Sequence, residues 1–124
     1  MPSEATMKAA MQAYLDNFNA GNLDALVGLF TSDANVEDPV GAPAHNGKDE
    51  IRAFYGDALK NGARLSLSAP MRGSHSNAAA MAFEAKVGPL TVRIIDVMTF
   101  NDAGKITSMK AYFGPEDFIQ AGQA

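Results

Sequence analysis

The chain has 124 residues, of which 47% are hydrophobic, with a formal net charge of −4 and no cysteine. This length predicts a single domain, residues 1–124, and the acidic balance offers no basic face for nucleic acid or an anionic membrane. Without cysteine, disulfides and thiolate chemistry are excluded. No apolar run approaches the roughly 20 residues that span a bilayer, and the first residues lack a signal-peptide pattern, so we expect a cytoplasmic protein.

The first half of the chain shows helical periodicity in three segments. From about Ser3 to Ala20, apolar residues recur every three or four positions, and Ser3 can cap the start of this helix. We expect a short second helix over Leu23–Phe30. A third helix is predicted from about Asp49 to Lys60, followed by the sequence Asn61-Gly62, which is typical of a helix end.

Between the second and third predicted helices, the segment Ala34–Val40 alternates as a strand does. Pro39 cannot donate a ladder hydrogen bond, so this strand should be an edge strand or end there. The next residues, Gly41–Gly47, are typical of a loop. His45 in this loop, and His75 in a later one, are therefore expected to be exposed.

After Gly62 the period of the pattern changes from 3.6 to 2, which predicts strands. Three helices followed by an antiparallel meander predict an α+β fold. A curved sheet closing over the helices would leave a cone with an apolar cavity, which suits a small molecule. The predicted strands are Leu65–Leu67, Ala78–Val87, Leu90–Phe100 and Lys105–Phe113, with turns at Gly88-Pro89 and Asn101–Gly104.

Two aspartates stand where the strand pattern asks for an apolar residue. Asp96 shares its predicted face with five hydrophobic residues, and Asp38 lies on the apolar face of its strand. An inward carboxyl is costly unless it is paired, hydrogen-bonded or kept neutral. Asp38 is close enough to a turn to cap backbone amides, but Asp96 is in the middle of a strand and Arg93 should lie on the opposite face. Together the two acids indicate a working site.

Tyr14 is a third polar residue on an apolar face, that of the first helix. A buried phenol needs a hydrogen-bond partner, and the candidates are a backbone carbonyl, Tyr55 or an inward carboxyl. A phenol and two carboxyls in one apolar interior suit proton abstraction next to a carbonyl. Asp38, at a strand end, can stay ionised as the base, whereas Asp96 among apolar residues should stay neutral and act as a donor.

Other chemistries have little support. The two histidines lack the spacing of metal ligands, so no metal site is expected. There is no P-loop or GxGxxG motif, and no serine stands in a nucleophile elbow. The methionines fall mostly on inward faces, where they either pack the core or form an adaptable lining for a large apolar ligand.

At these residues the chain resembles the ketosteroid isomerases (steroid Δ-isomerases) of the nuclear transport factor 2-like superfamily. The resemblance extends over almost the whole chain. It implies a cone-shaped fold in which three N-terminal helices pack on a curved antiparallel or mixed sheet. Its most specific stretches are Val36–Gly41, Ile95–Met98 and Ser108–Phe113, with support from Ile51–Tyr55.

The resemblance also implies roles for individual residues, in a family well known for combining a base aspartate, a tyrosine and a protonated aspartate. Asp38 matches the general base that moves a proton from C4 to C6 of a Δ5-3-ketosteroid. Tyr14 and Asp96 match the oxyanion-hole donors to the C3 oxygen, and Tyr55 matches a tyrosine that hydrogen-bonds behind Tyr14. Positions that match the lining or support of the steroid cavity are Phe30, Phe54, Met81, Phe83, Met98, Met109 and Phe113.

Three further expectations follow from the resemblance. The family uses no cofactor or metal and forms homodimers through its sheets. Phe30 stands where some members carry a further tyrosine, so the hydrogen-bond network should be shorter here. The hairpin between Val87 and Leu90 is shorter than in bacterial members and could alter cavity access or the dimer contact. The alternatives are a related cyclase or epoxide hydrolase, or a binding protein for an apolar small molecule.

Overall fold

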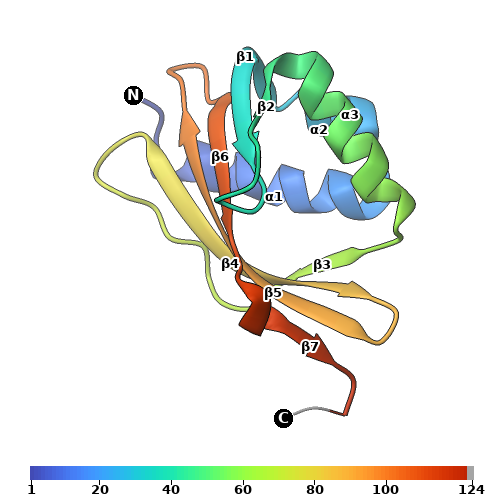
Figure 1. The fold of residues 1–124 in the computed structure, drawn as a ribbon. Coiled ribbons are helices and arrows are strands. Elements are labelled where there is room, and N and C mark those ends of the chain that lie inside the picture. The colour runs from blue at the N-terminus through green and yellow to red at the C-terminus, as the bar shows by residue number, and fades with distance from the viewer. Residues whose placement is uncertain (123–124) are drawn as a thin grey trace.

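The computed structural model describes residues 1–122 and shows helices packed on an open, mixed sheet of seven strands (Figure 1). This confirms the predicted α+β class. The helices are α1 (Glu4–Ala20), α2 (Leu23–Val27), α3 (Gly47–Lys60) and the 3-10 turn η1 (Pro115–Asp117). The strands are β1 (Phe30–Glu37), β2 (His45–Asn46), β3 (Arg64–Leu67), β4 (Ala78–Val87), β5 (Leu90–Phe100), β6 (Ile106–Tyr112) and β7 (Phe118–Gln120).

The strand order places the end of β1 one strand, β6, away from the middle of β5. The order is β2-β1-β6-β5-β4-β3, with β7 pairing with β5. Strands β3 to β6 form the predicted antiparallel meander, whereas β1 joins β6 in parallel. Just after β1, the amide of Val40 donates to the carbonyl of Ala111 at 2.9 Å, and Ala111 is the cross-strand partner of Asp96. The mixed topology therefore brings the two inward aspartates to one place.

Helix α1 lies against the bent sheet and supplies much of the core (Figure 1). Its start is capped by Ser3, whose hydroxyl accepts from the amide of Thr6 at 3.1 Å, as predicted. It ends at Gly21, whose φ of 70° favours glycine. Within the described residues, no helix is both long and apolar enough to cross a membrane.

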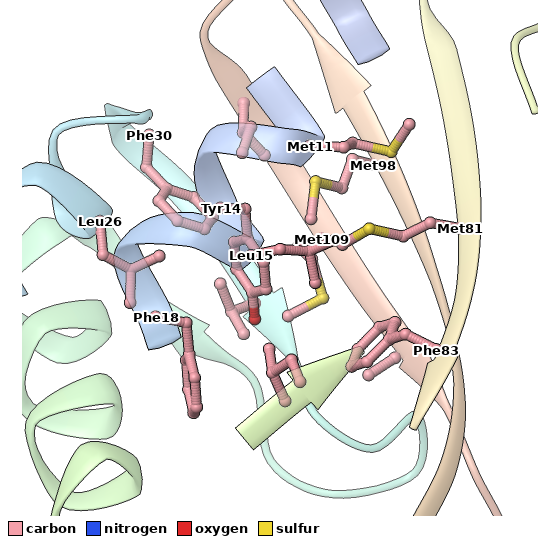
Figure 2. Packing of buried hydrophobic residues seen from close by; sticks show 14 of the residues in the cluster. Met11, Tyr14, Leu15, Phe18, Leu26, Phe30, Met81, Phe83, Met98 and Met109 are labelled. Carbon is pink, nitrogen blue, oxygen red and sulfur yellow. The ribbon is translucent and has the colours of Figure 1, made fainter. Parts of the chain in front are cut away.

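The buried face of α1 packs on methionine side chains of the sheet. Figure 2 shows Met11 of α1 close to Met81, Met98 and Met109, which come from three neighbouring strands. All four side chains are at most 1% exposed. Flexible thioethers fill irregular gaps well, which explains their frequency in this core.

The second helix is shorter than predicted, because the chain enters the sheet earlier. It ends at Val27, and Phe30 is the first residue of β1 instead of the last residue of a helix. The carbonyl of Leu29 accepts from the amide of Ile106 at 2.8 Å, and Phe30 pairs with Ile106. This contact with a strand 76 positions away in the sequence overrides the local helical pattern.

The strand that contains the first aspartate is also shifted relative to the prediction. It starts at Phe30 and ends at Glu37, so Asp38 and Pro39 follow the strand, joined by a cis peptide bond. Pro39 was expected to mark an edge strand or its end, and β1 does not reach it, ending two residues earlier. Val40, predicted to face inward with Asp38, is instead 41% exposed, because the alternation stops where the ladder stops.

Two further segments differ from the predictions. His45 and Asn46, assigned to a loop, pair with β1 as the short strand β2. His45 is therefore half-buried instead of exposed, whereas His75 is exposed as expected. After Phe113 the structure shows η1 and β7. Neither was predicted, because both are too short to give a periodic pattern in the sequence.

Candidate active site

A cavity of about 160 Å³ lies between the helices and the sheet, lined by Tyr14, Asp38, Tyr55 and Asp96 together with apolar side chains. These four polar residues come from α1, the end of β1, α3 and β5, so the fold brings together groups that are up to 82 positions apart. The other lining residues are Phe18, Phe54, Ala58, Asn61, Ala63, Leu65, Phe83, Ala85 and Ile94.

Tyr14 and Tyr55 form a hydrogen-bonded pair, with their hydroxyl oxygens 2.9 Å apart. Of the three partners open to Tyr14 from sequence, the structure shows Tyr55. Burial raises the pKa of Tyr14 well above 10, with the neighbouring Tyr55, Asp96 and Asp38 adding to the effect. Both phenols therefore remain neutral. If Tyr55 donates to Tyr14, the proton of Tyr14 is free to donate to a ligand oxygen in the cavity.

The tyrosine pair is closed off by aromatic rings. The ring of Phe30 lies 5.9 Å from that of Tyr55, and Phe54 meets Tyr55 edge-on at 5.0 Å. Phenylalanine offers no hydroxyl to extend the network beyond Tyr55. This arrangement agrees with the expected short hydrogen-bond network. Tyr55 hydrogen-bonds to Tyr14, and the rings of Phe30 and Phe54 pack against Tyr55.

Apart from the two tyrosines, Asp96 is the one polar or charged residue among the buried side chains of residues 1–122, with 1% of its surface exposed. Its two cross-strand neighbours, Met81 and Ala111, are equally buried and cannot hydrogen-bond a carboxylate. Neither carboxyl oxygen has a hydrogen-bond partner among the described residues. Burial, and secondarily the carboxylate of Asp38, raises the pKa of Asp96 well above its usual value. Asp96 is therefore a neutral acid with a proton available for an incoming acceptor.

Asp38 lies in a milder environment at the end of a strand. It is half-buried, and burial raises its pKa from 3.8 to about 6. At neutral pH most molecules therefore carry an ionised Asp38 beside a protonated Asp96. Burial thus favours the protonated form more strongly in Asp96 than in Asp38, and such a difference in surroundings can separate an acid from a base.

Arg93 does not neutralise either acid of the cavity. It is exposed on β5 and lies 3.4 Å from the carboxylate of Asp117, the last residue of η1. The opposite-face prediction for Arg93 is thus confirmed. No charged partner offsets the burial of Asp96 from that side.

The other residues implied by the resemblance fall into three places. Phe54 and Phe83 line the cavity. Phe113 is half-buried near the end of β6, where it packs edge-on against Phe118 at 5.7 Å and lies outside the lining. The residues in the core behind the cavity are Phe30, Met81, Met98 and Met109.

Several lining residues escaped the sequence interpretation, although spacing could have found some of them. Phe18 lies one turn after Tyr14 on α1, and Ala58 and Asn61 continue the Phe54 face of α3 at helical spacing. Ile94 shares the inward face of β5 with Asp96. Ala85 likewise shares the inward face of β4 with Phe83, whereas the contributions of Ala63 and Leu65 had no sequence signal.

The chain is similar to known proteins over most of its length. The model of the SnoaL-like domain family matches residues 11–109. Steroid Delta-isomerase from Nocardioides simplex is 40% identical over 119 residues, which cover 93% of this chain and 95% of that protein. Orange carotenoid-binding protein from Synechocystis is 34% identical over 58 residues, which cover 47% of this chain but 18% of that protein.

A solved structure extends the likeness to the fold. The epoxide hydrolase/cyclase-like enzyme SalBIII, described in pyran ring formation in polyether salinomycin, superposes with a TM-score of 0.89 at 26% identity. The superposition covers 97% of this chain and 99% of that one. The cone-shaped fold implied by the sequence resemblance is thereby confirmed. The chain therefore belongs to the SnoaL-like, nuclear transport factor 2-like family, as an isomerase homologous to steroid Delta-isomerase.

Proposed function

We propose that this protein is a Δ5-3-ketosteroid isomerase, which moves the C5=C6 double bond to C4=C5 through a dienolate intermediate. The observation that carries the proposal is the pairing of an ionisable Asp38 with a buried, unpartnered Asp96 in one cavity. The similarity to Steroid Delta-isomerase supports the substrate class. A binding protein for an apolar ligand would have no use for an unpaired acid in its core.

In the first step, the carboxylate of Asp38 takes a proton from C4. The electrons of that C–H bond form a C3=C4 double bond, and the electrons of the carbonyl move to the C3 oxygen. Tyr14 and Asp96 donate hydrogen bonds to this oxygen as it becomes negative. Donors that are already oriented in a water-poor cavity stabilise such charge more strongly than water does.

In the second step, the proton carried by Asp38 is delivered to C6. The dienolate electrons re-form the C3 carbonyl, the double bond shifts to C4=C5, and Asp38 returns to the carboxylate. The enzyme supplies and consumes no net proton. A base with a pKa of about 6 binds the C4 proton more strongly than an ordinary aspartate does, and is mostly ionised at neutral pH.

An epoxide-opening activity is the second candidate, because of the close superposition with the epoxide hydrolase/cyclase-like enzyme SalBIII. In that chemistry, Asp38 would deprotonate a hydroxyl or water nucleophile, and the protonated Asp96 would give its proton to the epoxide oxygen. The same two acids would serve as base and proton donor, and transfer of a proton from Asp38 back to Asp96 would restore both. Only a substrate assay separates the two activities.

We further propose a homodimer formed through the outer face of the sheet. Ala82, Ile95 and Tyr112 stand side by side on three neighbouring strands, with Ile95 49% and Tyr112 47% exposed. An apolar row of this kind in the middle of a sheet is typical of an interface.

The mass of the protein in solution, measured by light scattering, should be twice the mass of one chain. Ile95→Lys should shift it toward the monomer, while Gln12→Lys on the helical side should not.

The turnover assay tests the proposed function directly. The protein is incubated with a Δ5-3-ketosteroid, and the absorbance of the conjugated enone is followed. In deuterated water, intramolecular transfer predicts that the hydrogen gained by C6 is mostly the one removed from C4, with little deuterium from the solvent. Absence of turnover above buffer at high enzyme concentration would overturn the proposal, and turnover of an epoxy alcohol in a parallel assay would favour the second candidate.

We also propose that this enzyme is located in the cytoplasm, because the absence of cysteine suits that reducing compartment.

A further inference from the structure

A second hollow of about 530 Å³ lies on the outer side of α3, separate from the active-site cavity. We call it the outer groove; its walls include His45, Glu50 and Asp57. Phe54, Ala58 and Asn61 line both this groove and the active-site cavity. The two hollows are therefore separated by one layer of side chains from α3.

The active-site cavity is small for the substrate that the proposed function requires. Its volume of about 160 Å³ is well below the roughly 300–1,000 Å³ of pockets that enclose drug-sized ligands. A four-ring steroid bound at Tyr14 and Asp96 must therefore extend past the present wall. The cavity is partly open to solvent, so a long ligand gains space either through this mouth or by movement of a wall, and the outer groove is the neighbouring space that can receive a wall side chain.

Phe54 is the large wall residue that also borders the outer groove. Tyr14, Tyr55 and Phe83 are at most 3% exposed and are held in the core. Phe54 is only half-buried, and the outer groove lies on its far side. A turn of its ring toward the groove would join the two hollows into one elongated site.

His45 opposes that movement of Phe54. Its imidazole ring is stacked on the Phe54 ring, with centroids 4.5 Å apart and an interplanar angle of 28°. The backbone of His45 is fixed by pairing with Val36 on β1, and the next amide, that of Asn46, donates to Glu50 at 2.8 Å. Strand β2 and helix α3 lie side by side in Figure 1. The wall residue Phe54 belongs to α3, and His45 of β2 holds its ring in place.

We propose that His45 is a specificity-determining positioning residue, which holds the Phe54 ring closed and so sets the length of substrate that the cavity accepts. The inference rests on the proposed function for the identity of the substrate. It adds a size filter that neither the family match nor the relatives assign. His45 touches no reacting atom and acts only through Phe54.

The test compares ligands of two lengths that present the same oxygen. A phenol resembles the dienolate at the C3 oxygen, so 2-naphthol and a four-ring phenolic steroid are suitable probes. His45→Thr removes the ring while its β-branched side chain suits strand β2. We expect the Kd of the four-ring phenol to fall two- to tenfold, the range of one stacked aromatic pair, while that of 2-naphthol changes less than twofold.

Three variants control for other causes. His45→Phe keeps a flat ring on Phe54 and should bind both phenols as the unmodified protein does. His75→Thr removes the exposed histidine and should change nothing. In a Phe54→Leu background, His45→Thr should have no further effect on the ratio of the two Kd values, because the ring on which His45 acts is gone.

The outcomes separate this inference from the proposed function. An unchanged ratio of Kd values in His45→Thr, an equal shift for both phenols, or the same shift in His45→Phe would overturn the role of His45. If circular dichroism shows that His45→Thr is unfolded, His45→Val is measured against the same criteria. Failure of the unmodified protein to isomerise either a two-ring or a four-ring β,γ-unsaturated ketone would overturn the proposed function, while the Kd ratio still tests the size filter.

Discussion

Asp38 and Asp96 are the same amino acid in two surroundings, and the difference between the surroundings explains the site. Asp38 follows the end of β1, where the ladder stops and the side chain stays half-buried. Asp96 is in the middle of β5, with Met81 and Ala111 beside it and 1% of its surface exposed. Position along a strand thus decides how much water a carboxyl keeps, and hence which one ionises at neutral pH.

Asp38→Asn should have the largest effect, because an amide cannot accept the C4 proton. We expect kcat to fall about 10²- to 10⁴-fold, the usual contribution of a general base. Steady-state turnover of the ketosteroid measures it, and Asp33→Asn, an exposed aspartate of β1, is the matched control. Near-normal turnover in Asp38→Asn would remove Asp38 from the base role.

Asp96→Leu should have the next largest effect on activity. The change removes one donor to the C3 oxygen, and we expect kcat to fall about 10²- to 10³-fold. Binding of a neutral ketone should change less than turnover, because the donor matters most when the oxygen carries charge. A decrease below about threefold would contradict a catalytic role for Asp96.

The pH profile sharpens the comparison of the two acids. Because the pKa of Asp38 is raised to about 6, kcat/KM should rise with pH up to that value and level off above it. Below pH 6, each unit of acidification should reduce kcat/KM about tenfold. The protonated Asp96, whose pKa is raised well above 3.8, should add no inflection on the acidic side. A profile that is flat from pH 4 to pH 8 would contradict the assignment of Asp38.

Protein stability should show the smallest effect, in the direction opposite to activity. The folded-state pKa of Asp96 is raised, so on raising the pH the unfolded chain loses this proton first and the free energy of unfolding falls. Asp96→Leu removes this penalty. Urea unfolding should show a stability gain for the variant that is larger at pH 8 than at pH 5, by about 1 kcal/mol or more. A pH-independent difference would mean that Asp96 keeps an ordinary pKa.

Asp38 should also lower the free energy of unfolding as the pH rises, but over a narrower pH range. Its pKa is raised from 3.8 to about 6, so its cost to stability appears between these two pH values and is then constant. Asp38→Asn should therefore gain roughly 1–3 kcal/mol above pH 6 and little below pH 4. Both acids are expected to lower stability for the sake of function.

The local sequence pattern predicted the helices and most strands well. It did not predict the residues whose place in a strand depends on pairing with a distant segment. The bounds of α1 and of strands β4 and β5 agree with the prediction within one residue. Phe30 was predicted to end the second helix because the polar residues 31–33 follow it, and only the pairing with Ile106 places it in β1. The same kind of long-range pairing, between His45 and Val36, explains why a presumed loop residue is half-buried.

The sequence by itself determined that Asp96 and Tyr14 face the core, because side-chain direction follows from the period of a single strand or helix. It also indicated that Asp38 belongs with them. Only the tertiary structure decided that the tyrosine pair, the base and the neutral acid share one cavity, because the parallel pairing of β1 with β6 joins segments that no local pattern relates. The stacking of His45 on Phe54, which separates that cavity from the outer groove, depends on the same long-range contacts.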